Sequence, residues 1–170
     1  MISKELVINY DKVKIKICHN IIETLSNYIQ KGRCSIESGG ILIGKENKSN
    51  NNIIINHMTT PMPGDKSKYD RFLRRDEKHL EAFENLYVTS SKTLRYIGEW
   101  HTHPEAIPNF SYLDENNWNK ITCDSKNNND YFHIIVGYEA IRVWVMNNKK
   151  CHPELVKTIL WKEVEKYETS

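Results

Sequence analysis

The stretch GEWHTHP at residues 98–104, followed by SYLD at residues 111–114, decides how this chain is interpreted. The residues around the first segment predict a strand that ends at Pro104, because proline has no backbone N–H to donate to a sheet. On a strand, His101 and His103 face the same side, with backbones about 6.5–7 Å apart. We therefore expect the strand end to present both imidazoles together.

The second segment offers a third metal ligand. Residues 113–123 predict a helix, and Asp114 in its first turn can point back toward the end of the strand. Two imidazoles and one carboxylate can hold a zinc ion, with Zn–N distances of about 2.0–2.1 Å, and leave a fourth tetrahedral position for water. Such an open position is typical of catalytic zinc sites, whereas structural sites are closed by four protein ligands.

Each of these residues also has an ordinary structural interpretation. A His-x-His pair on a strand is more often an exposed face than a metal site, and Ser111 with Asp114 forms a helix-capping pattern. Glu37, which precedes a Gly-Gly pair, would normally be a solvated turn residue. Glu99 shares the strand face of the histidines and either supports a ligand from behind or is solvated. We expect Trp100, on the opposite face, to pack in the core.

The composition excludes several classes of function. Hydrophobic residues make up 39% and charged residues 27% of the 170 residues, as in an ordinary globular protein. With 24 Lys and Arg against 22 Asp and Glu, the net charge of +2 does not favour nucleic acid as a partner. There is no run of about 18 apolar residues and no apolar core of a secretory signal near the N-terminus. We therefore expect a cytoplasmic protein that spans no membrane.

The remaining reactive or charged residues have plainer interpretations. Four scattered cysteines are expected to be reduced and buried as small hydrophobic residues: Cys18, Cys34, Cys123 and Cys151. Five basic residues predict a solvated loop and helix start: Lys66, Lys68, Arg71, Arg74 and Arg75. Five histidines lack ligand-like spacing and are expected on the surface or packed: His19, His57, His79, His133 and His152.

Hydrophobic periodicity predicts a single α/β domain over residues 1–170, with a mixed β-sheet flanked by helices. Alternating or short apolar runs predict strands at residues 6–8, 13–17, 40–44, 53–55, 94–102, 131–138 and 141–146. Helical spacing predicts helices near residues 21–29, 73–87 and 113–123, the second with Leu80, Phe83, Leu86 and Tyr87 on its apolar face. A closing helix is expected from Pro153 onward, with a strand at residues 159–161 as the alternative. Residues 60–69, which include two prolines, are expected to be a surface loop.

The combined pattern resembles the JAMM motif, also called JAB or MPN+, of zinc metallopeptidases. In that motif an upstream Glu precedes His-Ser/Thr-His-Pro, and seven residues separate the second His from Ser-x-x-Asp. Here residues 104–110 are those seven. The sequence ESGGILIG at residues 37–44 resembles the Glu-x-Gly-Gly-x-Leu-x-Gly segment of the family. The resemblance covers about residues 13–146.

The resemblance implies a role for each residue of the pattern. One Zn²⁺ ion per chain would be held by His101, His103 and Asp114. Glu37 would act as general base and acid toward a water whose pKa zinc lowers to about 7. Ser111 would steady the oxyanion.

The resemblance also implies a class of substrate. Family members mostly cleave the isopeptide or peptide bond that follows the C-terminal glycine of a ubiquitin-like protein. The form GEWHTHPE is most similar to bacterial proteases of anti-phage operons. These detach a cyclic-nucleotide synthase (a nucleotidyltransferase) or a ubiquitin-like protein from its targets. We further expect the substrate tail to add a strand at residues 40–44 and the loop at residues 60–69 to close over it.

Two other functions remain as alternatives. A metal-free scaffold of the same fold would serve only as an interaction module, but such relatives usually lack a ligand or the Glu, and this chain has all of them. DNA-repair-associated relatives carry His-Asn-His-Pro-Ser-Gly, whereas this chain has Thr102 and Glu105-Ala106 at those places.

Overall fold

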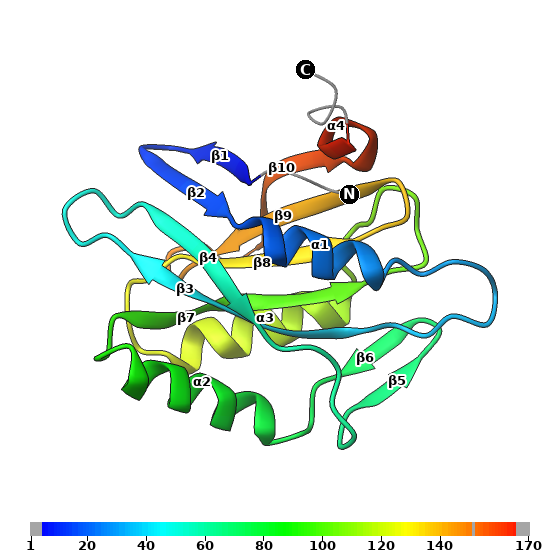
Figure 1. Ribbon diagram of the computed structural model, residues 1–170, viewed down its shortest axis with the longest axis horizontal. Helices are drawn as coiled ribbons and strands as arrows, with labels where there is room; N and C mark the ends of the chain where they lie inside the picture. The colour runs from blue at the N-terminus through cyan, green and yellow to red at the C-terminus, as the bar shows by residue number, and fades with distance from the viewer. Residues whose placement is uncertain (1–4, 151, 166–170) are drawn as a thin grey trace.

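The computed structural model describes residues 5–150 and 152–165. Its main feature is an eight-stranded mixed sheet with the order β1-β2-β4-β3-β7-β8-β9-β10 (Figure 1). Its strands are β1 (Leu6–Tyr10), β2 (Val13–Ile17), β3 (Gly39–Glu46), β4 (Ile53–Met58), β7 (Leu94–Thr102), β8 (Tyr131–Val136), β9 (Ala140–Met146) and β10 (Glu154–Leu160). A separate hairpin pairs β5 (Lys66–Lys68) with β6 (Arg71–Leu73). The helices are α1 (His19–Asn27), α2 (Lys78–Thr89), α3 (Tyr112–Asp124) and α4 (Trp161–Glu165). The predicted α/β class is confirmed.

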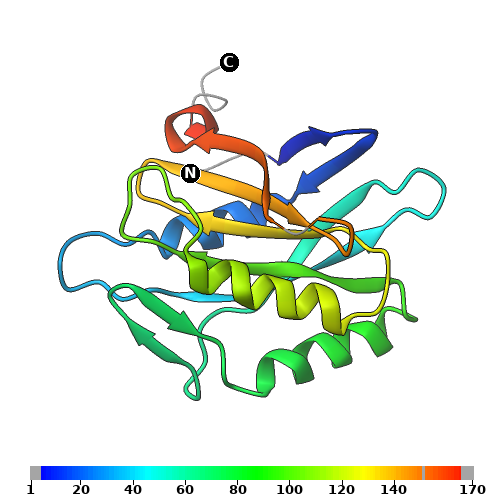
Figure 2. The ribbon, with the colours of Figure 1, turned by 180° about the vertical axis from the view of Figure 1, so that it is seen from behind.

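Helices cover both faces of the sheet. Both faces present apolar side chains to be buried, because successive side chains of a strand point to opposite faces. On one face, Ile21, Ile22 and Leu25 of α1 pack into the largest core cluster. Figure 2 shows α2 and α3 together on the other face. There α2 packs over β3, and Trp118 of α3 packs against β8 and β9. The sheet is therefore the middle layer of three.

β7, which leads to both histidines, lies in the middle of the sheet. It pairs antiparallel with β3 and parallel with β8, and the segment containing α3 provides the crossover that parallel neighbours need. Gly98 is required in β7 because a Cβ there would clash with the backbone carbonyl of Phe132 on β8. The predicted bounds of this strand, residues 94–102, are confirmed. Trp100 is 1% exposed in the core, also as predicted.

The segment between β4 and α2 differs from the prediction. The loop predicted over residues 60–69 is confirmed for residues 60–65, but residues 66–73 form the β5–β6 hairpin, and α2 begins at Lys78 instead of residue 73. The Asp65 carboxylate accepts hydrogen bonds from three backbone N–H groups, and these bonds compete with a helical conformation. The donors are Met62, Arg75 and Asp76, at 2.8–3.0 Å. The five basic residues between positions 66 and 75 therefore lie on or beside a hairpin, not in a loop and helix start.

The predicted apolar face of α2 is only half correct. Phe83 and Leu86 pack against β3 and β7, but Leu80 and Tyr87 are 47% and 38% exposed. The fully buried residue of the helix is His79, in its first turn. The periodicity of α2 could not show this, because the partner of His79 is polar and comes from the preceding segment.

A buried polar chain anchors the hairpin segment at its base. His79 Nε2 lies 2.8 Å from Asp65 Oδ2, and His79 Nδ1 lies 2.5 Å from Thr59 Oγ1. Thr59 Oγ1 in turn accepts the N–H of Ile41 on β3 at 2.9 Å. The start of α2 and the end of β4 are thereby tied together, so the intervening hairpin is held at both ends.

The closing helix predicted from residue 153 is wrong over residues 154–160, which form β10, and the alternative of a strand at residues 159–161 is correct for residues 159 and 160. β10 pairs antiparallel with β9, and α4 begins only at Trp161. The register shifts between Leu155 and Lys157, which inserts one extra residue into β10. Val156 and Ile159 therefore both reach the core although they are three residues apart. In the sequence, apolar residues three positions apart are also typical of one face of a helix.

Two further expectations are wrong. Residues 40–44 offer no free edge, because residues 42–46 pair with β4 and residues 39–45 with β7. Cys34 and Cys123 are exposed free thiols instead of buried ones: Cys34 lies in a turn before β3, and Cys123 lies in the last turn of α3. Cys151 lies outside the described residues. In the described part of the chain, no helix has the length and apolar character needed to cross a membrane.

Candidate metal centre

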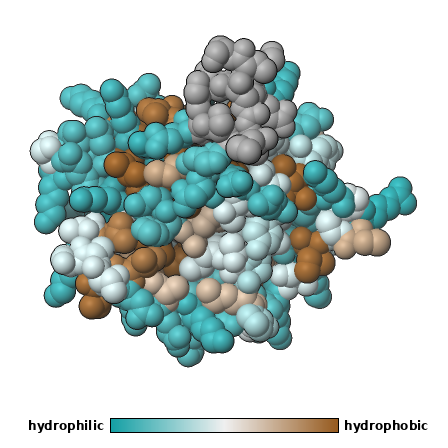
Figure 3. All heavy atoms as spheres, in the orientation of Figure 1, coloured by the Kyte–Doolittle hydropathy of each residue, from teal (hydrophilic) through white to brown (hydrophobic). Residues whose placement is uncertain are grey.

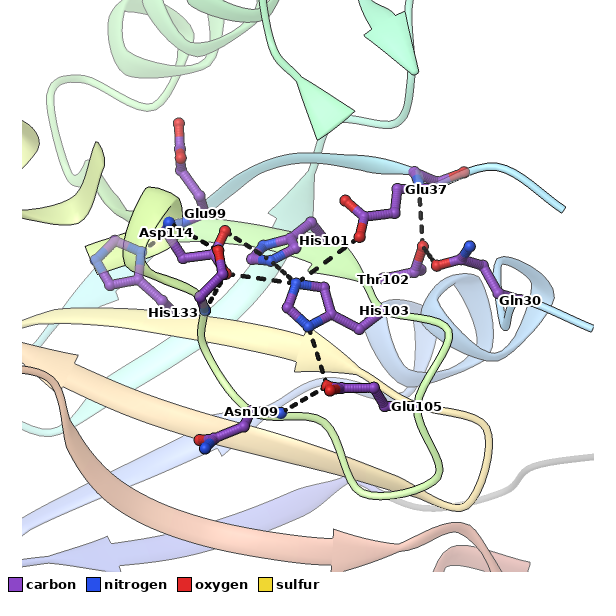
Figure 4. Close-up of polar contacts among 12 residues, drawn as sticks. Gln30, Glu37, Glu99, His101, Thr102, His103, Glu105, Asn109, Asp114 and His133 are labelled. Carbon is purple, nitrogen blue, oxygen red and sulfur yellow. Dashed lines mark hydrogen bonds and ion pairs between the residues drawn. The ribbon is translucent and has the colours of Figure 1, made fainter. Parts of the chain in front are cut away.

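His101 and His103 lie on the same side of the chain at the C-terminal end of β7. Their Nε2 atoms are 2.9 Å apart, and each residue is only 8% exposed. The ring planes meet at 60°, with centroids 4.7 Å apart. Figure 4 shows the two Nε2 atoms directed at a common point. The structure therefore brings this predicted pair together.

Asp114 reaches the same point from the first turn of α3. Its Oδ1 lies 3.2 Å from His101 Nε2, and its Oδ2 lies 3.4 Å from His103 Nε2. Ser111 caps the helix: its Oγ accepts the Asp114 N–H at 3.2 Å, and its own N–H donates to Asp114 Oδ2 at 2.6 Å. This reciprocal capping box fixes the carboxylate at the start of the helix and aims it at the histidines.

The three side chains fit a divalent metal ion. One donor atom from each of His101, His103 and Asp114 lies within 4.8 Å of the others. A tetrahedral ion with bonds of about 2.0–2.1 Å places its ligand atoms about 3.4 Å apart. The Nε2–Nε2 distance of 2.9 Å is close to that value, as are the distances of 3.2 Å from His101 Nε2 to Asp114 Oδ1 and 3.4 Å from His103 Nε2 to Asp114 Oδ2. Two nitrogens and one carboxylate oxygen are also the donor set of open zinc sites.

The electrostatics of the cluster favour a bound cation. Burial raises the pKa of Asp114, but the nearby His101 and hydrogen bonds from both histidines hold it well below its ordinary value. Burial lowers the pKa of His103, but its hydrogen bond to Asp114 and the charges of Asp114 and Glu37 raise it overall. The site thus attracts positive charge, which a divalent ion can supply in place of imidazole protons.

Glu37 lies beside the cluster without joining it. Its Oε1 is 3.8 Å from His103 Nε2, and the residue is only 4% exposed. It directly precedes the segment that enters β3, where its N–H donates to Lys68 O at 2.7 Å. Burial raises the pKa of Glu37 to about 7, against the opposing influence of His101 and His103. Such a carboxyl group can gain and lose a proton near neutral pH.

Comparison with known proteins agrees with this geometry. The sequence profile of the prokaryotic homologs of the JAB domain matches residues 27–157. The chain belongs to this family. Among curated proteins, this JAB domain is similar to an enzyme of Pseudomonas aeruginosa named CD-NTase/cGAS isopeptidase. The two are 32% identical over 122 residues, which cover 72% of this chain and 76% of the relative. An Escherichia coli protein of the same name is 32% identical over 104 residues, or 61% of this chain and 65% of the relative.

A solved structure supports the fold of the JAB domain. The solution structure of the protein DSY2949 from Desulfitobacterium hafniense superimposes with a TM-score of 0.57 and covers 89% of this chain and 97% of that one. The sequence identity is 11%, so the likeness concerns the fold alone.

Glu105 is a functional candidate that the sequence analysis did not find. Its Oε2 lies 3.2 Å from His103 Nδ1 and also accepts the Asn109 N–H at 3.0 Å. An imidazole that donates from Nδ1 to a carboxylate presents its Nε2 lone pair to a metal. The available signal was the acidic residue two positions after His103 in the sequence.

Ser111 is engaged in capping and lies beside the cluster. Besides accepting from the Asp114 backbone, its Oγ donates to Asp114 Oδ2 at 2.7 Å. The predicted capping role is confirmed. The oxyanion role stays a prediction, and it requires the hydroxyl to turn from Asp114 toward a substrate.

Glu99 does not support a histidine ligand. Its Oε1 accepts from Arg74 Nε at 2.8 Å, in the wall opposite α3. Its backbone N–H donates to His133 Nδ1 at 3.1 Å. His133 is fully buried and stacked on Trp118, with centroids 4.4 Å apart, and burial lowers its pKa to about 3. His133 is therefore a neutral, packed residue, as expected for a histidine without ligand-like spacing.

Two hollows of the JAB domain flank the cluster, with volumes of about 250 and 180 Å³. Phe72, Asp114 and Asn117 line both of them. The first also contains His101 and the Arg74–Glu99 pair, and the second contains His103 and Glu37. The hairpin strand β6 and helix α3 thus form opposite walls of a groove that passes the three convergent side chains.

The face seen in Figure 3 is mostly hydrophilic, with apolar residues in small separate groups.

Proposed function

We propose that this chain is a zinc-dependent isopeptidase that detaches a protein conjugated through its C-terminal tail. The observation that carries the proposal is the convergence of His101, His103 and Asp114, with Glu37 buried within 4 Å of the cluster. Two neutral nitrogens and one carboxylate are a catalytic donor set rather than a structural one. The name shared by the relatives, CD-NTase/cGAS isopeptidase, supports the same reaction class.

Each residue has a distinct task in the proposed reaction. His101, His103 and Asp114 would hold the metal, and Glu105 would orient the His103 ring. Zinc, when bound, supplies a Lewis acid that acidifies water and polarises the scissile carbonyl. Glu37 would accept a proton at its carboxylate and then deliver one to the leaving amine, because it lies beside the cluster and burial raises its pKa above the ordinary value of 4.5.

The proposed substrate is a conjugated CD-NTase, the enzyme class in the names of the relatives. A ubiquitin-like conjugate, which the resemblance also implies, stays a prediction, as does a role in anti-phage defence. An extended tail would lie in the groove between β6 and α3. Among the described strands, β6 pairs only with β5, so its other edge can hydrogen-bond to a tail. This edge of β6 replaces the edge of residues 40–44 as the expected binding site of the tail.

The decisive experiment compares two kinds of variant. Glu37→Gln should retain about one zinc per chain and lose turnover of a CD-NTase conjugate, because the carboxylate moves protons without binding the metal. Asp114→Ala should lose both zinc and turnover, because it removes a ligand. Elemental analysis and gel-based cleavage measure the two outcomes. Wild-type protein that takes up no zinc, or Glu37→Gln that keeps near-full activity, would overturn the proposal.

A further inference from the structure

Thr102, between the two histidines, faces the opposite side of β7 and is fully buried. Its Oγ1 accepts the backbone N–H of Ser38 at 3.0 Å and donates to Gln30 Oε1 at 3.0 Å (Figure 4). The backbone N–H of Thr102 also donates to Ser38 O at 2.9 Å. The strand that leads to the metal ligands is thus joined to the residue that follows Glu37.

Gln30 extends this connection to the β5–β6 hairpin. It lies just beyond α1, is 4% exposed, and donates from Nε2 to the carbonyl of Tyr69 at 3.0 Å. Tyr69 is in the turn between β5 and β6. The orientation of the Gln30 amide is determined by its partners, because only the NH₂ group can donate to a carbonyl, while the oxygen accepts from Thr102.

The chain of hydrogen bonds closes on itself at Glu37. The backbone N–H of Glu37 donates to Lys68 O at 2.7 Å, next to Tyr69. The ring therefore runs from Glu37 through the hairpin turn to Gln30, then to Thr102, and back through Ser38. Every donor in it meets an acceptor, and all of its hydrogen-bonding groups are neutral.

This ring lies where the sheet alone gives little support. The ladder between β3 and β7 begins at Gly39, so Glu37 and Ser38 precede the paired part of β3. The hairpin turn is likewise outside the main sheet. A displacement of about 1 Å at a reacting group can reduce a rate by up to about 100-fold. Bonds that hold Glu37 in place therefore matter to any reaction that uses it.

We propose that Gln30 and Thr102 are positioning residues that hold Glu37 and the hairpin turn in register with the histidines. The wall of the groove and the general base are thereby coupled, so a change at one is transmitted to the other. The catalytic part of this inference rests on the proposed function. The structural part, that Gln30 restrains Glu37 without touching it, is independent of the proposed function.

The test uses near-isosteric variants that remove the bonds. Gln30→Met removes both bonds of the amide, Thr102→Val removes those of the hydroxyl, and Thr102→Ser keeps them as a conservative rescue. Asn20→Ala is the matched control, because Asn20 donates from its side chain to the Asn56 carbonyl on β4 but is outside the ring. The measurements are zinc content, kcat and KM on a conjugate, and hydrogen exchange of the Glu37 amide.

Gln30→Met and Thr102→Val should each keep zinc, lower kcat about 10-fold and speed exchange of the Glu37 amide about 10-fold. The double variant should cost little more than either single one, because both break the same ring. Thr102→Ser and Asn20→Ala should stay within about twofold of wild type. Exchange at Glu37 that is unchanged in Gln30→Met, or kcat losses matched by Asn20→Ala, would overturn the coupling. If zinc-loaded wild type cleaves no conjugate, the proposed function fails, and the exchange measurement still decides the coupling.

Discussion

Replacing Glu37 by glutamine should stabilise the metal-free protein at pH 8, although we expect the same replacement to abolish activity. The Glu37 side chain is 5% exposed, and burial raises its pKa from an ordinary value of 4.5 to about 7. The folded state therefore binds this proton more tightly than the unfolded state. The resulting stabilisation is complete below about pH 4.5 and is lost as the pH rises through about 7.

The magnitude follows from the difference between the two pKa values. From 4.5 to about 7, at about 1.4 kcal/mol per pKa unit, the difference is about 3 kcal/mol. Above pH 7 the wild-type protein carries the cost of a buried carboxylate, whereas a glutamine amide stays neutral. The free energy of unfolding of Glu37→Gln should therefore exceed that of wild type by about 3 kcal/mol at pH 8 and by little near pH 5. Bound zinc should shrink the difference, because a nearby cation favours the ionised carboxyl group.

Urea unfolding of chelator-treated protein at several pH values between 5 and 8 measures this difference. Glu105→Gln is the matched control, since Glu105 is also a carboxylate beside His103 but its side chain is 49% exposed. A difference between wild type and Glu37→Gln that does not grow from pH 5 to pH 8 would refute the reasoning.

Three further predictions concern the groove and its supports. Glu105→Gln should weaken zinc binding about 10–100-fold by loosening the His103 ring, as measured by competition with a chelating dye; unchanged affinity would contradict the assigned contact. Gly40→Ala should lower the Tm by about 2–10 °C, because the added Cβ would clash with the backbone carbonyl of Thr59; an unchanged Tm in a thermal melt would show that the backbone at Thr59 can shift without loss of stability. Phe72→Ala should raise KM for a conjugate about 10-fold and change hydrolysis of a short peptide less, since Phe72 lines both hollows. Equal KM values for variant and wild type on the conjugate would remove β6 from the recognition surface.

The sequence was most informative where a local repeat sets the geometry. The alternation of a strand places His101 and His103 on one side, and the capping pattern places Asp114 in the first turn of α3. Because these relations span few residues, the strand bounds and the convergence of the three ligands could be predicted. The position of Glu37 came only from the resemblance to a family, since a Glu before two glycines has no local meaning.

Hydrophobic periodicity gave the wrong secondary structure where a helix and a bulged strand share the same apolar spacing. The apolar positions of β10 imitate a helix because a bulge at the sheet edge brings Val156 and Ile159 to the same core. The start of α2 was placed too early because Asp65, ten and eleven residues from its partners Arg75 and Asp76, takes their backbone N–H groups. Both errors concern hydrogen bonds whose partners are distant in the sequence.

The sequence by itself therefore determined the central strand, the α/β class and the three side chains, His101, His103 and Asp114, that converge at its end. Tertiary structure alone decided what surrounds the ligands: the β6 wall, the Glu105 contact and the ring through Gln30 and Thr102. The physical reason is that a strand repeat puts His101 and His103 on one side and a capping pattern puts Asp114 in the first turn of the helix, and both are short, regular backbone relations. A groove wall and a buried hydrogen-bond ring instead join segments up to 72 residues apart, as between Gln30 and Thr102, and no local pattern records such a pairing.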